Sequence, residues 1–224
     1  MRFSRVIFLG LAIATGSANA QSEAPNIQPR VRGLDLFRQG SLRDAIPELQ
    51  KSLQSNFADA EVRLHLAFAY DRLGSADEAI TEYRRVTELQ PNSYFAHNNL
   101  GVLYDKQGRY DEAIAAFESA GRIDSTNAGA KINLATARKN KALVQERDAQ
   151  IQKAENAAAI NPQDAQVSFS AARIHAHYGN RAEALEWLAR ARRQGYKDLA
   201  SVKNDPSFKN FSNDRDFELI LIGK

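Results

Sequence analysis

The amino-acid sequence predicts an all-α protein in which one helix pair is repeated along the chain. Two sets of small residues recur at one fixed interval, and a period of about 34 residues indicates stacked helix–turn–helix units. The sets are Gly40, Gly74 and Gly108, and Ala45, Ala79 and Ala113. The 224 residues include no cysteine, so packing and not disulfide bonds must hold such an array together.

Residues 94–127 form the clearest unit. Leu100 and Gly101 lie on one face of a predicted first helix, and the small Gly101 lets a second helix cross closely. Gly108 stands where the first helix must stop, because glycine readily adopts the left-handed cap conformation. Phe117 belongs to the buried stripe of the predicted second helix.

Two earlier units, residues 26–59 and 60–93, repeat this pattern. The first of them departs from it: Arg32 stands where the next two units have leucine, and Phe57 stands where the second unit has proline. An atypical terminal repeat is expected, because its outer face has no neighbour to pack against.

The register of the repeat shifts after residue 127. Three markers follow their counterparts by two periods plus three positions, and they are Pro162, Gly179 and Ala184. We therefore expect a divergent fourth unit over residues 128–164, with a short insertion near residues 139–147. Ala142 stands where a turn glycine is expected, so this unit is either two helices or one long helix.

A fifth unit covers residues 165–198. The segment 199–224 is rich in aromatic and aliphatic residues, among them Phe208 and Phe217. We expect this segment to cap the exposed apolar end of the last unit. The alternative is a docking helix for a partner.

The spacings resemble those of the tetratricopeptide repeat, a 34-residue helix–turn–helix unit. The resemblance lies in Leu66-Ala67-x2-Tyr70 and Leu100-Gly101-x2-Tyr104, each followed by a turn glycine and an Ala-x3-aromatic pattern. It implies a right-handed α-solenoid of about five helix pairs with a C-terminal capping segment. It also implies that the first helices line a concave groove, which in such proteins binds a segment of another protein.

The N-terminus predicts export of the chain. Residues 1–20 combine a basic start, an apolar stretch and an Ala-x-Ala end, which is typical of a signal peptide cleaved after Ala20. Residues 21–25 are polar, and we expect a flexible N-terminus there. The alternative, a membrane anchor, needs a longer apolar stretch. We expect a bacterial envelope location, most simply the periplasm.

The charge of the chain gives no indication of a nucleic-acid or anionic-membrane partner. The full sequence has 30 basic and 27 acidic side chains, and loss of Arg2 and Arg5 with the signal leaves 28 against 27, a net charge of +1. A protein or peptide partner is therefore expected, with no small-molecule ligand and no membrane insertion after signal cleavage.

No enzymatic activity, cofactor or metal is expected. The sequence has no His-Glu-x-x-His run, phosphate-binding glycine loop or Gly-x-Ser-x-Gly elbow. His175 and His177 are two residues apart, so on a helix they point to different sides and make a poor metal pair.

The candidate binding residues are those on the first helices that point away from the predicted core. We expect a partner-binding groove lined by Leu64, His65, Phe68, Arg72, Phe95, Asn99, Val102, Lys106 and Asn133. Three of them, His65, Asn99 and Asn133, recur at the period of the repeat and form a polar ladder that can hold a peptide backbone. The alternative is that this ladder stabilises packing between units. For the charged residues Arg72 and Lys106, we favour the interpretation that they form local ion pairs on a solvent-exposed face over a role in partner selection.

One subclass of the resembled family grips the C-terminal carboxylate of chaperones with a clamp of lysine, arginine and asparagine. Here Leu34 and His65 stand at two clamp asparagine positions, and Phe95 stands at a clamp lysine position. The sequence therefore does not predict chaperone-tail specificity.

The sequence thus predicts a non-enzymatic, exported scaffold that binds a segment of another envelope protein in its groove. The alternative is an accessory subunit of cell-envelope or exopolysaccharide assembly that contacts glycan or lipid directly. That alternative needs exposed aromatic platforms, and the only tryptophan, Trp187, falls on a predicted second helix, where a core role is expected.

Overall fold

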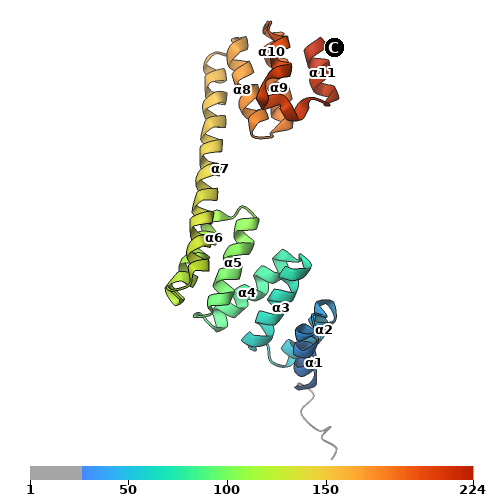
Figure 1. Cartoon of the computed structure of the whole chain (residues 1–224), viewed down its shortest axis with the longest axis vertical. Coiled ribbons are helices and arrows are strands. Elements are labelled where there is room, and N and C mark those ends of the chain that lie inside the picture. The colour runs from blue at the N-terminus through green and yellow to red at the C-terminus, as the bar shows by residue number, and fades with distance from the viewer. Residues whose placement is uncertain (1–26, 224) are drawn as a thin grey trace, which may run out of the picture. The chain divides into compact units, whose positions relative to one another are not determined.

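The computed structural model describes residues 27–223, and every regular element in this range is a helix (Figure 1). The prediction of an all-α fold is therefore confirmed for these residues. The predicted signal peptide and the stretch 21–25 lie outside the described residues. The helices are α1 (Ile27–Arg38), α2 (Leu42–Ser55), α3 (Ala60–Leu73), α4 (Ala76–Leu89), α5 (Tyr94–Lys106), α6 (Tyr110–Ile123), α7 (Ala128–Ile160), α8 (Ala165–His177), α9 (Arg181–Arg193), α10 (Leu199–Asn204), the 3-10 helix η1 (Pro206–Phe211) and α11 (Arg215–Ile222).

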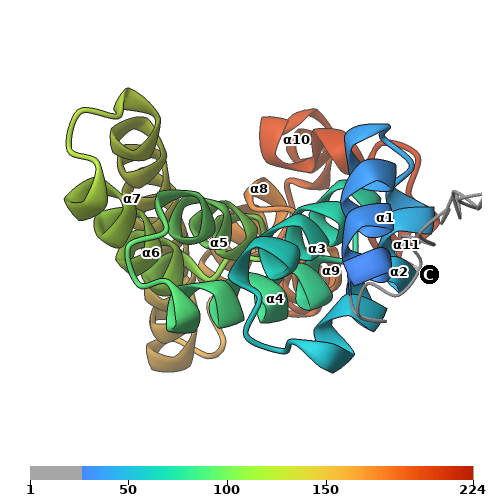
Figure 2. The same cartoon turned by 90° about the horizontal axis from the view of Figure 1, so that it is seen from below.

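The chain divides into two compact units. The first consists of the described residues up to Gln107 together with Ala116–Asn127. The second consists of Gly108–Ala115 and the chain from Ala128 onward. Figure 2 shows α1 beside α2 and α3 beside α4 in the first unit, as the repeat period predicts.

Glycine ends the first helix of each helix pair. The turns of α1–α2, α3–α4, α5–α6 and α8–α9 contain glycines whose φ lies between 74° and 84°. A side chain rarely tolerates this left-handed conformation, whereas glycine does. At Gly74, for example, the backbone N–H donates to the carbonyls of Asp71 and Tyr70, which closes the end of α3. The recurring glycines of the sequence are therefore helix caps.

Small residues let the two helices of a pair cross closely. A Cβ placed on Gly33 would lie 2.8 Å from a side-chain carbon of Leu49. A Cβ placed on Gly101 would lie 2.5 Å from the ring of Phe117. The side chains opposite these glycines are fully buried, with Leu49 at 0% and Phe117 at 2% exposure. The period thus marks the points at which the first and second helices touch.

The fourth predicted unit is one continuous helix. Helix α7 runs for 33 residues without a turn (Figure 1), and Ala142 lies inside it. The stretch from Ala130 to Asn161 has neither glycine nor proline, so nothing in it interrupts helix formation. Of the two possibilities that the sequence left open, the structure contains the long helix.

The C-terminal segment packs onto the last helix pair. Phe208 lies against Phe169 of α8, with ring centroids 6.3 Å apart, and against Phe217 of α11, at 5.5 Å. Phe208 and Phe217 are each 1% exposed, and Leu188 of α9 in the same cluster is fully buried. Helices α10, η1 and α11 therefore complete the core of the last pair.

The described helices contain no candidate for a membrane span. None between residues 27 and 223 is both long and apolar enough to cross a bilayer.

Candidate partner-binding surface

Most of the predicted groove residues lie on the first helices of the first unit. We call the following set the first-helix face: Leu64, His65, Phe68 and Arg72 on α3, and Phe95, Asn99, Val102 and Lys106 on α5. Phe95 is 66% exposed and Phe68 is 39% exposed. The two cationic side chains are also exposed, and the remaining members are half-buried.

The ninth predicted residue, Asn133, belongs to the second unit, where it lies on α7. Asn133 is therefore not part of the first-helix face. Within the first unit, the predicted ladder consists of His65 and Asn99.

An aromatic cluster forms between α1 and α3. The ring of Phe37 meets His65 edge-on at a centroid distance of 4.6 Å and Phe68 at 5.6 Å. The guanidinium carbon of Arg72 lies 6.0 Å from the centre of the Phe68 ring. A half-exposed aromatic ring beside a guanidinium offers both apolar contact and a positive charge. This combination suits a partner segment with an apolar and an acidic side chain.

Sequence reasoning missed Phe37. Its counterparts in the next two units are Asp71 and Asp105, so the repeat gives no signal that this position is aromatic. Only the packing of α1 against α3 places the Phe37 ring beside His65. The one available signal is its place four positions after Gly33 on the predicted first helix.

Asn99 has a packing role in the structure. Its side-chain nitrogen donates to the hydroxyl of Tyr83 at 3.0 Å. Tyr83 is fully buried on α4, and burial raises the pKa of its hydroxyl well above its usual range despite the hydrogen bond from Asn99. A buried hydroxyl needs a partner, and Asn99 provides it across the boundary between two repeats. This contact is the packing alternative considered for the ladder.

His65 is also engaged within its own helix. Its Nδ1 lies 2.8 Å from the carbonyl oxygen of Glu61, one turn earlier, and donates to it. The imidazole ring is thereby fixed beside Phe37. His65 therefore contributes ring surface to the first-helix face.

The charged positions make local ion pairs. Arg38 contacts Asp35 at 2.8 Å on the same helix, and Lys106 of α5 lies 3.9 Å from Asp71 of α3. Because the two cationic side chains are well exposed, such pairs contribute little to stability, at most about 1 kcal/mol. Lys106 therefore remains available to a partner that carries a carboxylate.

The start of α3 is fixed by an acidic cap. Asp59 accepts from the backbone N–H of Val62 at 3.0 Å and from Arg30 of α1 at 2.9 Å. Burial alone would raise the pKa of Asp59, but these hydrogen bonds outweigh burial and lower the pKa below its usual value. Asp59 thus joins two neighbouring repeats and orients the helix that carries Phe68.

The described residues show no metal-binding cluster. Between residues 27 and 223, no group of three or more His, Asp or Glu side chains is placed to hold an ion. His175 is buried and His177 is exposed, so the two imidazoles face different surroundings.

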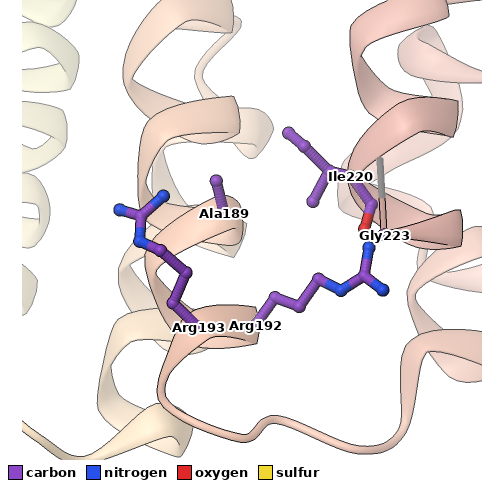
Figure 3. Close-up of a pocket in the computed structure, with 5 residues that line it drawn as sticks. All are labelled: Ala189, Arg192, Arg193, Ile220 and Gly223. Atoms are coloured by element: carbon purple, nitrogen blue, oxygen red, sulfur yellow. Dashed lines mark hydrogen bonds between the residues drawn. The ribbon is translucent and has the colours of Figure 1, made fainter.

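The basic residues at the end of α9 serve the packing of the C-terminal segment. Figure 3 shows Arg192 extending from α9 to α11, where it donates to the carbonyl of Ile220. These residues border a cavity of about 310 Å³ next to Gly223. Arg190 lies over the ring of Trp187 at 4.9 Å and donates to the carbonyl of Pro162 at 3.0 Å. Cationic side chains are also stabilising at the C-terminal end of a helix, where the helix dipole is negative.

Comparison with solved structures supports the fold. A crystal structure of the MamA protein is 19% identical over 85% of this chain and 95% of that chain, with a TM-score of 0.50. The MamA RS-1 ArsTM double mutant is 18% identical over 82% of this chain and 99% of that one, also at 0.50. The second TPR domain of human RPAP3, in complex with an HSP70 peptide, is 22% identical over 50% of this chain and 94% of that chain, with a TM-score of 0.47. At these identities the likeness concerns the fold alone.

No curated protein sequence matches the chain. The sequence profile of the tetratricopeptide repeat matches residues 30–94 and again residues 69–128. These ranges cover helices α1 to α6, and the turn of each of their three pairs contains a glycine with positive φ. The part of the chain from residue 30 to residue 128 therefore consists of tetratricopeptide repeats.

Proposed function

We propose that the chain is a non-enzymatic, exported scaffold, and that its first-helix face binds an extended or helical segment of another envelope protein. Stacked helical repeats present long, preformed surfaces of this kind. A preformed surface limits the ordering cost of binding to the partner's side.

The observation that carries the proposal is the exposure of aromatic rings beside cations on first helices. Phe95 and Phe68 are 66% and 39% exposed, and Arg72 lies next to the Phe68 ring. Large apolar side chains grouped on a surface indicate an interaction site. We expect the partner to place an apolar side chain on Phe68 and a carboxylate within reach of Arg72 or Lys106.

The alternative of direct glycan or lipid binding has less support. Trp187 is half-buried against the C-terminal core and is covered by Arg190. A sugar that stacks on this ring would have to compete with Arg190 and with the C-terminal core. We therefore retain the protein-binding proposal alone.

The test uses a photo-crosslinking amino acid at residue 95 of the full-length, tagged chain in its native cells. Residue 57 provides the control, because Phe57 is 75% exposed but lies in the turn between α2 and α3. We expect one defined envelope protein to be crosslinked from residue 95 and not from residue 57. Mass spectrometry of the purified adduct identifies that protein.

Substitution of the face then checks specificity. The double variant Phe68→Ala, Arg72→Ala should bind the identified partner roughly fivefold or more weakly, since truncating an aromatic or Arg anchor commonly costs about 1 kcal/mol or more. Phe57→Ala with Arg84→Ala, both exposed positions outside the face, should bind normally. Equal binding by both pairs, with helical content unchanged, would exclude this face as the site.

Export has its own test. We expect the chain recovered from the periplasmic fraction to begin at Gln21, which the mass of the intact protein measures. A chain that retains residues 1–20 and stays in the cytoplasm would contradict the envelope part of the proposal and leave the binding part standing.

A further inference from the structure

The second unit contains an apolar cleft between α7 and α8, with a volume of about 520 Å³. Its lining consists of Gln150, Lys153, Ala154 and Ala157 of α7 and Val167, Ser170 and Ile174 of α8. Each lining residue has equivalent residues in the complete repeats. The contacts of those equivalent residues show which helix covers this position elsewhere in the chain.

The α7 side of the cleft corresponds to a surface that is buried in a complete repeat. Gln150 and Ala157 lie one period before Ala184 and Ala191 of α9. Ala184 and Ala191 are fully buried, because the first helix of that pair, α8, packs against α9. In α7, by contrast, Gln150 is exposed and Ala157 is half-exposed. Ala154, which lies between them, is 9% exposed, so the α7 side of the cleft is a second-helix surface that is only partly covered.

The α8 side of the cleft corresponds to a surface that faces the preceding repeat. Val167 and Ile174 follow Ala96 and Leu103 of α5 by two periods plus three positions, the shift that the turn markers also show. Ala96 is 0% exposed and Leu103 is 2% exposed, whereas Val167 and Ile174 are each partly exposed. The α8 side is thus also incompletely covered.

A first helix covers this surface elsewhere in the chain. Ser170 follows His65 of α3 by three periods plus three positions, and His65 packs against Phe37 of the preceding first helix, α1. Among the described residues of the second unit, no such first helix precedes α8, and on that side α8 packs against α7. The cleft therefore has the form of a seat for the first helix of the fourth repeat.

The first half of α7 has the register of that missing helix. Leu134 and Ala135 lie one period after Leu100 and Gly101. Gly101 is buried against Phe117 of its own second helix, whereas Ala135 is exposed. Residues 128–141 therefore present a first-helix surface without its second helix.

A straight α7 keeps these two incomplete surfaces apart. The step from Ala135 to Ala154 corresponds to roughly 28 Å along a helix at about 1.5 Å per residue. The other helix pairs of the repeat turn at a glycine with positive φ, but the equivalent residue here is Ala142, in the middle of the helix. The chain is therefore not built to fold back and fill its own seat.

The two segments differ in net charge. Residues 128–141 have four basic side chains and no acidic one. Residues 142–164 have four acidic and two basic side chains, and one of the basic ones, Lys153, lines the cleft. Opposite net charges favour association of the two segments, and the register is set by the repeat period.

We propose that the cleft between α7 and α8 binds residues 128–141 of a second copy of this chain. The exchange is reciprocal, so each copy supplies one helix and receives one. A two-fold dimer formed in this way leaves neither surface bare. Domain swapping of this type follows when a hinge favours the straight form over the turn.

Disulfide trapping tests the proposal, because the chain has no cysteine of its own. Ala135 and Ala154 correspond to Gly101 and Phe117, which touch in α5 and α6. Cysteines at these two positions should therefore lie within disulfide distance, about 7 Å or less between Cα atoms, only when the seat is filled. The single variants Ala135→Cys and Ala154→Cys are coexpressed as full chains, one with a size tag, and then oxidised.

We expect a covalent pair that contains one chain of each type, and a native mass of twice the monomer by light scattering. The control replaces Ala154→Cys by Gln152→Cys, which lies on the exposed side of α7 and should give no such pair. A single chain with both Ala135→Cys and Ala154→Cys should form covalent dimers. An internal disulfide in a monomer would overturn the proposal and show that the helix folds back. Absence of any disulfide, with helical content intact, would also overturn it, because another molecule would then fill the seat.

Discussion

The close crossing of α5 and α6 can be tested by adding one methyl group at Gly101. A Cβ at this position would lie 2.5 to 2.8 Å from three ring atoms of Phe117, which is closer than carbon atoms approach in folded proteins. Phe117 is 2% exposed, so its ring has little room to move. Overpacking of this kind costs roughly 1–3 kcal/mol.

The same substitution also has a favourable effect, because alanine is the better helix former by about 1 kcal/mol. Gly121→Ala isolates this second effect. Gly121 lies in α6, and a Cβ there would meet nothing within 4 Å. We therefore expect Gly121→Ala to stabilise the protein by up to about 1 kcal/mol, and Gly101→Ala to be less stable than Gly121→Ala by roughly 1–3 kcal/mol.

Urea unfolding followed by far-ultraviolet circular dichroism measures both variants. The midpoint for Gly101→Ala should fall below that of Gly121→Ala. Adding Phe117→Leu to Gly101→Ala should recover part of the loss, because the smaller side chain makes room for the new methyl group. If Gly101→Ala and Gly121→Ala stabilise the protein equally, the close approach of the two helices does not exist and the reasoning fails.

Three further outcomes follow from the contacts described above. Tyr83→Phe removes the hydroxyl that accepts from Asn99, so it should cost about 1 kcal/mol, and a double-mutant cycle with Asn99→Ala should show that the two effects are not additive. Asp59→Asn should lower the stability measured near neutral pH by roughly 0.2–1 kcal/mol, because asparagine can still cap the helix but loses the ion pair with Arg30. The pKa of Asp59 is lowered in the folded state. The stabilisation by its carboxylate is therefore present above the unfolded pKa of about 3.9 and is lost as the pH falls through the folded pKa. If wild type and variant differ in their free energy of unfolding by the same amount at a pH below both of these pKa values, the carboxylate is not responsible. Leu188→Ala, at a fully buried site of the C-terminal core, should cost roughly 2–5 kcal/mol in thermal or urea unfolding, and a loss under about 1 kcal/mol would mean that the core is loosely packed.

The helical class and the repeat follow from local features of the amino-acid sequence. Glycine conformation and helix propensity depend on a few neighbouring residues, so the turns at Gly40, Gly74, Gly108 and Gly179 could be predicted without a structure. The close crossings were predictable for a similar reason, because a small residue that recurs at one position of each unit indicates that a second helix packs closely there. These features placed the first-helix face, although binding by that face is a proposal.

Contacts between side chains of different repeats depend on how the helices pack. The hydrogen bond from Asn99 to Tyr83 joins residues of different helices, and the contact of Phe37 with His65 spans two repeats. No spacing rule predicts such pairs, because they depend on how far one helix is displaced along the next.

The fourth repeat could be predicted only in part from the sequence. The missing turn glycine at Ala142 was visible in the sequence, but it was compatible with a strained turn as well as with a straight helix. Whether the helix bends depends on the packing free energy of its two halves against that of a turn without glycine. In the structure α7 is one continuous helix, and both halves of the repeat contain exposed positions whose counterparts in the other repeats are buried.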